Sequence, residues 1–240
     1  MIRTLTIVAA AAASACHFGA EAETRDVGPA VTRNYQVGAF DRIEVSGPYE
    51  VNVTTGGAPA ARATGGDALL DQTEVFVEGN VLHIRPKKEK NRISWRWGKS
   101  GKAQFTVTTA VLHGAGIAGS GKVAVDKVVG DFKGEVAGSG DLRMAAVNGG
   151  AVALEIAGSG RIAAAGTAQS TSIDIAGSGN VDAAALTART ADVSIAGSGN
   201  VKVNASETAK VDIAGSGNVA VTGGAKCSVS KAGMGNVTCG

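Results

Sequence analysis

The sequence has few of the side chains on which most enzyme active sites and stacking surfaces depend. Of its 240 residues only nine are aromatic (two Trp, two Tyr and five Phe), four are proline and three are histidine. No histidine follows His113, no proline follows Pro86 and no aromatic residue follows Phe132. The second half of the chain therefore lacks the residue types most used for acid–base catalysis at neutral pH and for stacking on bases.

The chain also lacks a strong charge of either sign. Its formal net charge is +2, and residues 114–240 carry ten acidic and ten basic residues, mostly scattered singly. A bulk electrostatic attraction to nucleic acid is not expected from this balance, and we predict no nucleic-acid partner.

The N-terminus has the layout of a secretory signal peptide, which predicts an exported protein. A basic residue, Arg3, precedes a short apolar run and then small residues. Two endings compete within residues 1–22: a lipobox-like Ala-Ser-Ala before Cys16, which would be lipidated, and the A-x-A cleavage site Ala20-Glu21-Ala22. The polar, proline-containing residues that follow predict a linker over 23–34.

Beyond the signal region only Cys227 and Cys239 remain. An even number of cysteines in an exported chain favours a disulfide, and their spacing matches no common zinc motif. We therefore predict a Cys227–Cys239 disulfide that ties down the last part of the fold, with no metal site and no cofactor.

An internal repeat dominates residues 114–240. The tetrapeptide Ala-Gly-Ser-Gly recurs at spacings of 19, 20, 19, 20 and 18 residues, and an Ala-Gly-Met-Gly variant follows after 18 more. Such a period marks one supersecondary unit, which must stack on its neighbours to bury an apolar face. The seven copies begin at Ala118, Ala137, Ala157, Ala176, Ala196, Ala214 and Ala232.

Apolar and polar residues alternate on both sides of each tetrapeptide. One apolar column before it contains Ile156, Ile175 and Ile195, and one after it contains Ile162, Val181 and Val201. Alternation with period two indicates half-buried strands, and the glycines supply the positive φ of a sharp corner. The pattern predicts an all-β fold, a parallel β-helix with coils of 18–20 residues, stabilised by ladders of corner serines and of Asn180, Asn200, Asn218 and Asn236.

A second outward column carries carboxylates at coil spacing. Like charges so close repel one another unless they are balanced or bridged. The column is therefore expected either to be neutralised by flanking Lys and Arg or to make a weak Ca²⁺ contact. Its members are Glu135, Glu155, Asp174 and Asp212.

The N-terminal half alternates as well, and it carries a family resemblance. Residues 35–113 contain the runs GAFDRIEVSGPYEVNVTTG and GGDALLDQTEVFVEGNVLHIRPKK, and serial AGSGNV corners follow them. In these segments the chain resembles the head GIN domain family of bacterial envelope proteins, which carries an autotransporter adhesin label, over residues 35–240. The resemblance implies an exported, right-handed parallel β-helix whose irregular N-terminal coils or cap lie at 35–113.

One basic segment stands out as a candidate contact surface. Residues 85–102 hold eight Lys or Arg and a single Glu, with two tryptophans in the middle. The plain interpretation is a solvated hairpin tip; the functional one is a surface that binds an anionic glycan, the envelope surface or another protein through charge and stacking. The candidate residues are Lys87, Lys88, Arg92, Trp95, Arg96 and Trp97.

The sequence thus predicts a non-catalytic binding or scaffold protein of the periplasm or cell surface, in the lipidated case an outer-membrane lipoprotein. The alternative is a polysaccharide lyase or glycoside hydrolase built on the same coils. Such enzymes need clustered acids with a basic residue and long loops that wall a cleft, whereas the return segments here hardly vary in length.

Overall fold

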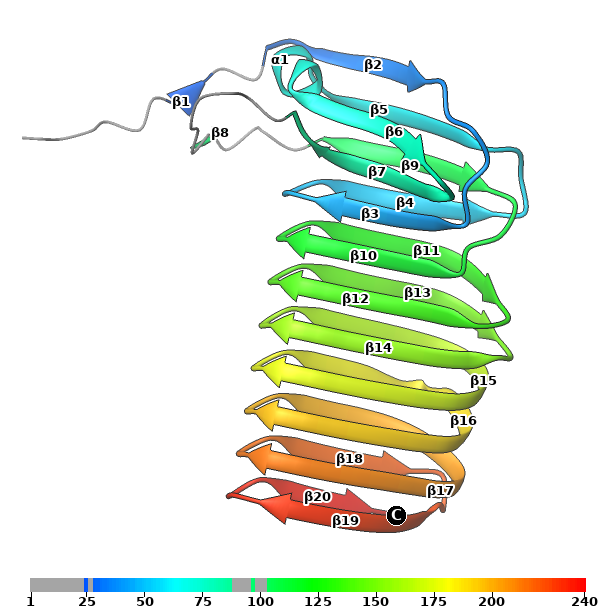
Figure 1. Ribbon diagram of the computed structural model, residues 1–240, viewed down its shortest axis with the longest axis vertical. Coiled ribbons are helices and arrows are strands. Elements are labelled where there is room, and N and C mark those ends of the chain that lie inside the picture. The colour runs from blue at the N-terminus through cyan, green and yellow to red at the C-terminus, as the bar shows by residue number, and fades with distance from the viewer. Residues whose placement is uncertain (1–23, 26–27, 88–95, 98–102) are drawn as a thin grey trace, which may run out of the picture.

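The structure is a computed structural model that describes residues 24–25, 28–87, 96–97 and 103–240. A stack of parallel β-coils makes up most of it, and an antiparallel cap closes the N-terminal end (Figure 1). The all-β class, the parallel coils and the strand-rich N-terminal half that the sequence indicated are confirmed. The right-handed sense of coiling stays a prediction.

The paired strands form two faces of the solenoid, named sheet 1 and sheet 2, and each coil runs once along each face. Sheet 1 runs through β6 (Thr73–Glu78), β7 (Val81–Pro86), β3 (Arg42–Ser46), β10 (Gly114–Gly119), β12 (Phe132–Gly138), β14 (Ala151–Gly158), the C-terminal parts of β15 (Arg161–Gly177), β16 (Asn180–Gly197) and β17 (Asn200–Gly215), and β19 (Lys226–Ala232). Sheet 2 runs through β2 (Ala30–Tyr35), β5 (Ala60–Gly66), β9 (Gln104–Thr109), β4 (Glu50–Thr55), β11 (Lys122–Val129), β13 (Asp141–Asn148), the N-terminal parts of β15 to β17, β18 (Asn218–Thr222) and β20 (Asn236–Cys239).

The period of the sequence sets the register of the coils. Ile156 pairs with Ile175 and Ile175 with Ile195, so each apolar column of the sequence becomes a stack inside the solenoid. These three side chains are at most 3% exposed. The alternation fixes the register because a slip by one residue would turn each of these columns toward the solvent.

The first glycine of each tetrapeptide forms the corner. Gly138 has φ +120°, and a Cβ there would lie 2.6 Å from the carbonyl oxygen of Gly119 in the preceding coil. The next residue, Ser139, donates its backbone N–H to that same carbonyl oxygen at 2.8 Å. Only glycine allows both the positive φ and this close approach of two backbones. The corner serines are exposed, and among the described residues backbone bonds take the place of the expected hydroxyl ladder. The asparagine ladder is present from Asn180 through Asn200 to Asn218, and Asn236 does not extend it by a side-chain bond.

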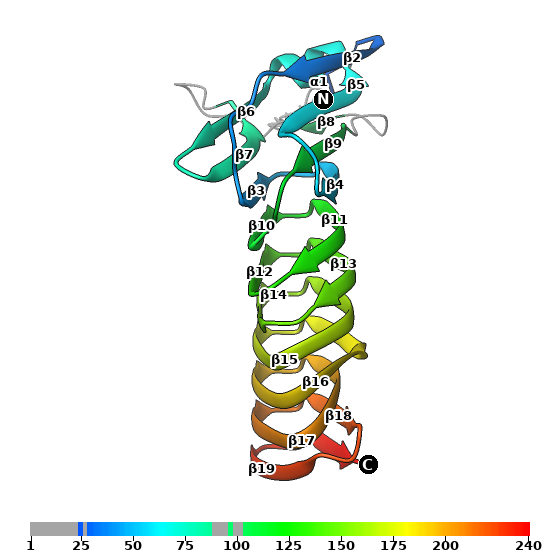
Figure 2. The same cartoon turned by 90° about the vertical axis from the view of Figure 1, so that its right-hand side faces the viewer.

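The cap is built from antiparallel strands. β5 pairs antiparallel with both β2 and β9, and β6 pairs antiparallel with β7, while β7 and β9 pair in parallel with β3 and β4 of the first coil. A short helix, α1 (Asp67–Asp71), joins β5 to β6. The figures show these elements covering the top of the stack (Figure 2).

Residues 30–34 were expected to be a linker, and the structure corrects this. They belong to β2, which pairs with the outer edge of β5. Val31 and Tyr35 of this strand pack against the core. The alternation of Val31, Arg33 and Tyr35 is a strand pattern, but polar residues between them and the neighbouring Pro29 obscure it. Arg33 also forms ion pairs with Asp67 and Asp71 of α1.

The far end of the solenoid is the coil of β19 and β20, which the Cys227–Cys239 disulfide closes, with Cα atoms 6.6 Å apart. The disulfide that the sequence predicted is therefore present. Cys227 stacks on Ala209 and Cys239 on Val221, both of which are buried, so each cysteine occupies an inward-facing column.

Candidate functional site

The basic segment chosen from the sequence is described only in part. Lys87 is exposed at the end of β7, and Lys88, Arg92 and Trp95 lie outside the described residues. Arg96 and Trp97 form the two-residue strand β8, whose side chains are likewise outside the description. The structure therefore does not bring these six side chains together in one described site.

The strand register nevertheless locates where this segment joins the fold. β7 pairs with β3 and β9 with β4, so the connection from β7 to β9 starts and ends at the edge where β3 turns into β4. That edge carries the glycine corners of all later coils. In addition, Thr24 and Arg25 of β1 (Thr24–Arg25) pair in parallel with Arg96 and Trp97. Residues 24–25, just after the predicted signal peptide, thus lie beside residues 96–97 of the basic segment, at the cap end of the molecule (Figure 1).

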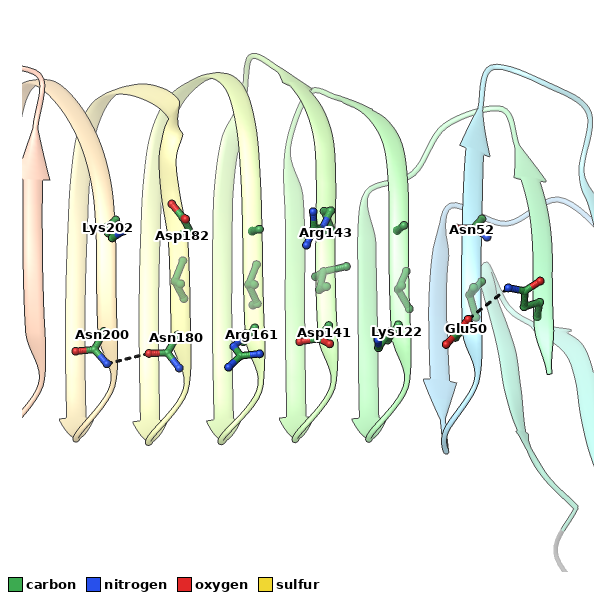
Figure 3. A pocket seen from close by; sticks show the side chains of 18 residues that line it. Glu50, Asn52, Lys122, Asp141, Arg143, Arg161, Asn180, Asp182, Asn200 and Lys202 are labelled. Atoms are coloured by element: carbon green, nitrogen blue, oxygen red, sulfur yellow. Dashed lines mark hydrogen bonds between the residues drawn. The ribbon is translucent and has the colours of Figure 1, made fainter. Parts of the chain in front are cut away.

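A second candidate site is a groove of about 700 Å³ on the outer face of sheet 2. It crosses β4, β11, β13, β15, β16 and β17, as Figure 3 shows. Two outward columns of side chains border it, separated by two residues along each strand, with the backbone of the intervening buried residues between them. The first column is Glu50, Lys122, Asp141, Arg161, Asn180 and Asn200; the second is Asn52, Ala124, Arg143, Ala163, Asp182 and Lys202.

The charges in the first column alternate in sign. Glu50, Lys122, Asp141 and Arg161 follow one another on successive strands, which lie about 4.8 Å apart. Alternation avoids the repulsion that like charges would suffer directly opposite each other. Arg143 stands two residues from Asp141 on the same face, so Asp141 has three cationic neighbours.

Within the described part of the chain, the side chains of Lys122, Asp141, Arg143 and Arg161 make no hydrogen bond and no ion pair within 4.0 Å. Lys122, Arg143 and Arg161 are exposed, and Asp141 is half-buried. The four groups are thus close enough to contact one ligand, and they are not bonded to one another.

Amides take over where the charges of the first column end. Asn200 donates its side-chain N–H to Asn180 at 2.9 Å, and Asn218 donates to Asn200 at 2.8 Å. Each amide of such a ladder keeps hydrogen-bonding capacity for a further partner. The first column therefore offers charged groups near the cap and amides farther along, where Asp182 and Lys202 stand in the second column.

The outer face of sheet 1 is different because its charges pair with one another. Lys133 contacts Glu135 at 2.8 Å and Glu155 at 3.0 Å, and Lys210 contacts Asp212 at 2.7 Å. Hydrogen bonds to Glu135 and Glu155 raise the pKa of Lys133 above its ordinary value. Lysines thus neutralise most of the outward carboxylate column that the sequence predicted. A weak Ca²⁺ contact was the alternative for this column. The described residues contain no group of three or more His, Cys, Asp or Glu side chains placed to hold a metal ion.

The two histidines that the structure describes make structural contacts in separate places. His83 lies 3.2 Å from Glu44 and stacks on Phe76 with ring centroids 5.1 Å apart. His113 Nδ1 lies 3.1 Å from the carbonyl oxygen of Asp131. Neither histidine faces the groove. No helix among the described residues has the length and apolar character needed to cross a membrane.

Sequence reasoning found the asparagine ladder and missed the charged part of the first column. The signal was available: the positions between the apolar columns read Lys122, Asp141 and Arg161 in successive repeats. What the repeat alignment could not show is that β4, which lacks the tetrapeptide, adds Glu50 to the same column.

Several solved structures share this fold. A protein from Bacteroides fragilis described as a putative adhesin has a TM-score of 0.78 and 24% sequence identity, covering 87% of this chain and 96% of its own. A Parabacteroides distasonis protein described as a putative lipid binding protein has a TM-score of 0.69 and 25% identity, covering 88% of this chain and 97% of its own. A Parabacteroides merdae protein described as a putative adhesin has a TM-score of 0.65 and 19% identity, covering 88% of this chain and 95% of its own.

No match is found among curated proteins. Residues 39–225, which span the first coils and almost the whole repeat stack, match one family over most of the chain. The protein belongs to the family described as "Putative auto-transporter adhesin, head GIN domain".

Proposed function

We propose that this protein is a non-catalytic, exported module of the bacterial envelope that binds a surface partner and holds it away from the membrane. The observation that carries the proposal is the regular stack itself. From β3 and β4 to β19 and β20 the coils stay in register on both sides of each glycine corner, and the register shifts fall in the return segments. Both outer faces remain open and continuous. Rigid, extended surfaces of this kind suit binding along their length.

The cap is the end that we place toward the membrane. β1 pairs with β8, and Thr24 follows Cys16 by eight residues, which span at most about 29 Å when fully extended. A lipid on Cys16 would therefore hold the basic segment with Trp95 and Trp97 near lipid headgroups. The Parabacteroides distasonis protein described as a putative lipid binding protein supports contact with lipid in general.

Vesicle flotation tests this orientation. The processed, unlipidated protein should float with vesicles that contain phosphatidylglycerol and not with phosphatidylcholine alone. Trp95→Ala with Trp97→Ala should weaken flotation, since both stacking at the interface and membrane insertion of aromatic rings would be lost. A matched control, Val229→Ala with Met234→Ala, removes two exposed apolar side chains at the opposite end and should leave flotation unchanged. Equal losses in both variants would contradict the orientation.

One observation favours the alternative, a polysaccharide lyase or hydrolase. The groove places the carboxylate of Asp141 beside the cationic side chains of Arg143 and Arg161. The other two carboxylates of the groove, Glu50 and Asp182, each lie two strands from Asp141, at about 10 Å in the same column and about 12 Å across to the second column. Both separations are far longer than the roughly 5 Å of a retaining glycosidase pair and stand at or beyond the upper end of the range of about 6.5–9.5 Å for an inverting pair. Release of reducing or unsaturated sugar by the wild type that Asp141→Asn abolishes would establish the enzyme and refute the non-catalytic role.

A further inference from the structure

The groove on sheet 2 has a local excess of positive charge at its centre. Lys122, Arg143 and Arg161 surround Asp141, so the four groups together carry a formal charge of +2. None of them is paired within the described residues, whereas lysines on sheet 1 are paired with carboxylates. An arginine that has no acidic partner is well suited to hold a carboxylate or sulfate through two parallel hydrogen bonds.

The shape of the groove favours a linear ligand. Its two columns run along the solenoid axis, as Figure 3 shows, and the six strands from β4 to β17 span about 24 Å at the usual strand spacing. Ala124 and Ala163 alternate with Arg143 in the second column, and these small side chains leave hollows on either side of the arginine. A chain of several sugar units fits such a track, and its hydroxyls would meet the amides of Asn180 and Asn200.

The sign and spacing of the charges in the groove restrict the class of ligand further. Asp141 and Asp182 stand among the cations, so a polymer with a phosphate at every unit would meet repulsion along part of the track. The residues that line the groove include no aromatic side chain, so neutral sugars would gain no stacking there. Spaced carboxylates or sulfates satisfy the central cations without crowding the acidic positions.

We infer that the groove is the binding site for a linear acidic polysaccharide, which lies along the solenoid axis with its acidic groups on Arg143 and Arg161 and its hydroxyls on the asparagine ladder. This inference rests on the proposed binding role and names its ligand class. It also separates two surfaces: the cap end contacts the membrane and the groove contacts the glycan.

Binding of the full processed protein to immobilised polygalacturonate tests the inference, with dextran as the neutral polymer and single-stranded DNA as the dense polyanion. The wild type should bind polygalacturonate, ignore dextran and bind DNA more weakly. Arg143→Gln with Arg161→Gln should weaken polygalacturonate binding by about tenfold or more, since two charge-assisted contacts are lost.

Two further variants test whether binding depends on where the charges lie or on the net charge of the protein. Arg189→Gln with Lys226→Gln removes the same number of charges outside the groove and should stay within about twofold of the wild type. Ala163→Trp keeps every charge, fills the hollow beside Arg143 and should also reduce binding by about tenfold. Circular dichroism and thermal melting establish that each variant is folded.

The outcomes distinguish this inference from the proposed function. Equal effects of the groove pair and its control, tighter binding of DNA than of polygalacturonate, or no polygalacturonate binding by the wild type would each overturn the groove assignment. The vesicle result for Trp95 and Trp97 would stand in all three cases, because it depends on the other end of the molecule. Binding accompanied by sugar release would keep the site and refute the non-catalytic role.

Discussion

The cap and the repeat stack are two parts of one continuous hydrophobic core, and they are built by different means. In the cap, Tyr49 packs edge-on against Phe105 with ring centroids 5.5 Å apart, and antiparallel strands join segments far apart in sequence. In the stack, aliphatic columns and glycine corners repeat coil after coil. The cap depends on individual large side chains, whereas the stack depends on small residues that let backbones approach.

A large effect on the whole stack is expected from a change to one of its corner glycines. Gly138→Ala would place a Cβ 2.6 Å from the carbonyl oxygen of Gly119 and would impose a φ of +120° on alanine. Steric overlap and backbone strain together should cost about 3 kcal/mol or more of unfolding free energy. Urea denaturation followed by circular dichroism measures the loss.

A cap glycine is the matched control for this change. Gly79, in the turn between β6 and β7, also has a positive φ of +62°, but nothing lies within 4 Å of a Cβ built there. Gly79→Ala should cost only about 1 kcal/mol, the price of the backbone conformation alone. If both variants lost equal stability, the close approach of backbones would not be what requires glycine in the corners.

Truncation of the cap core should have a large but local effect. Phe105 is fully buried between strands of the cap and the first coil, and Phe105→Ala should cost about 3–5 kcal/mol. Because each coil contacts only its neighbours, the damage should be concentrated in the cap. Hydrogen exchange should accelerate in β5 and β9 while amides of β16 stay protected; uniform acceleration would contradict a stack that is stable by itself.

Removal of the disulfide should have a smaller effect at the other end. Cys227→Ala with Cys239→Ala opens a loop of 12 residues, and the chain-entropy argument gives about 3 kcal/mol for a loop of this size. The opening should appear as rapid exchange in β19 and β20, with the cap unaffected. Protection of these strands equal to that of the wild type would show that the last coil needs no crosslink.

The smallest effect concerns the exposed ion pairs of sheet 1 and is visible in its pH dependence. Contacts with Glu135 and Glu155 raise the pKa of Lys133 above the ordinary 10.5. A raised pKa in the folded state stabilises the fold fully below 10.5 and loses this contribution as the pH rises through the folded value. Lys133→Gln should therefore lower the denaturation midpoint slightly at pH 8, and the difference from the wild type should shrink above pH 11. A difference that grows with pH would contradict the pairing.

The two regions also differ in how far the sequence predicted them. The columns of Ile156, Ile175 and Ile195 fix one register for the stack, and the phase of Cys227 and Cys239 placed both cysteines inward. The cap has no repeat to set its register: β5 pairs with β2 and with β9, strands more than twenty residues away in each direction. Alternation within a strand tells which side is buried but not which strand lies beside it.

The candidate sites, too, were predictable from the sequence only in part. Composition alone located the basic segment with Trp95 and Trp97, but only the pairing of β1 with β8 places it beside the N-terminal residues. The charged part of the first column combines β4 from the irregular half with β11, β13 and β15 from the repeats. The alternating sign of its charges can be recognised in the repeat alignment when the outward-facing positions are compared as carefully as the inward-facing ones.

The direction of the hydrogen bonds has a mechanical consequence. Bonds between coils run along the long axis, so a force between an anchored cap and a ligand near the far end would act on successive coil interfaces in series. The weakest interface then sets the load that the whole rod withstands. The disulfide joins the two sides of one coil, β19 and β20, and does not bridge two coils. It would therefore keep the last coil closed under tension without adding tensile strength to the stack.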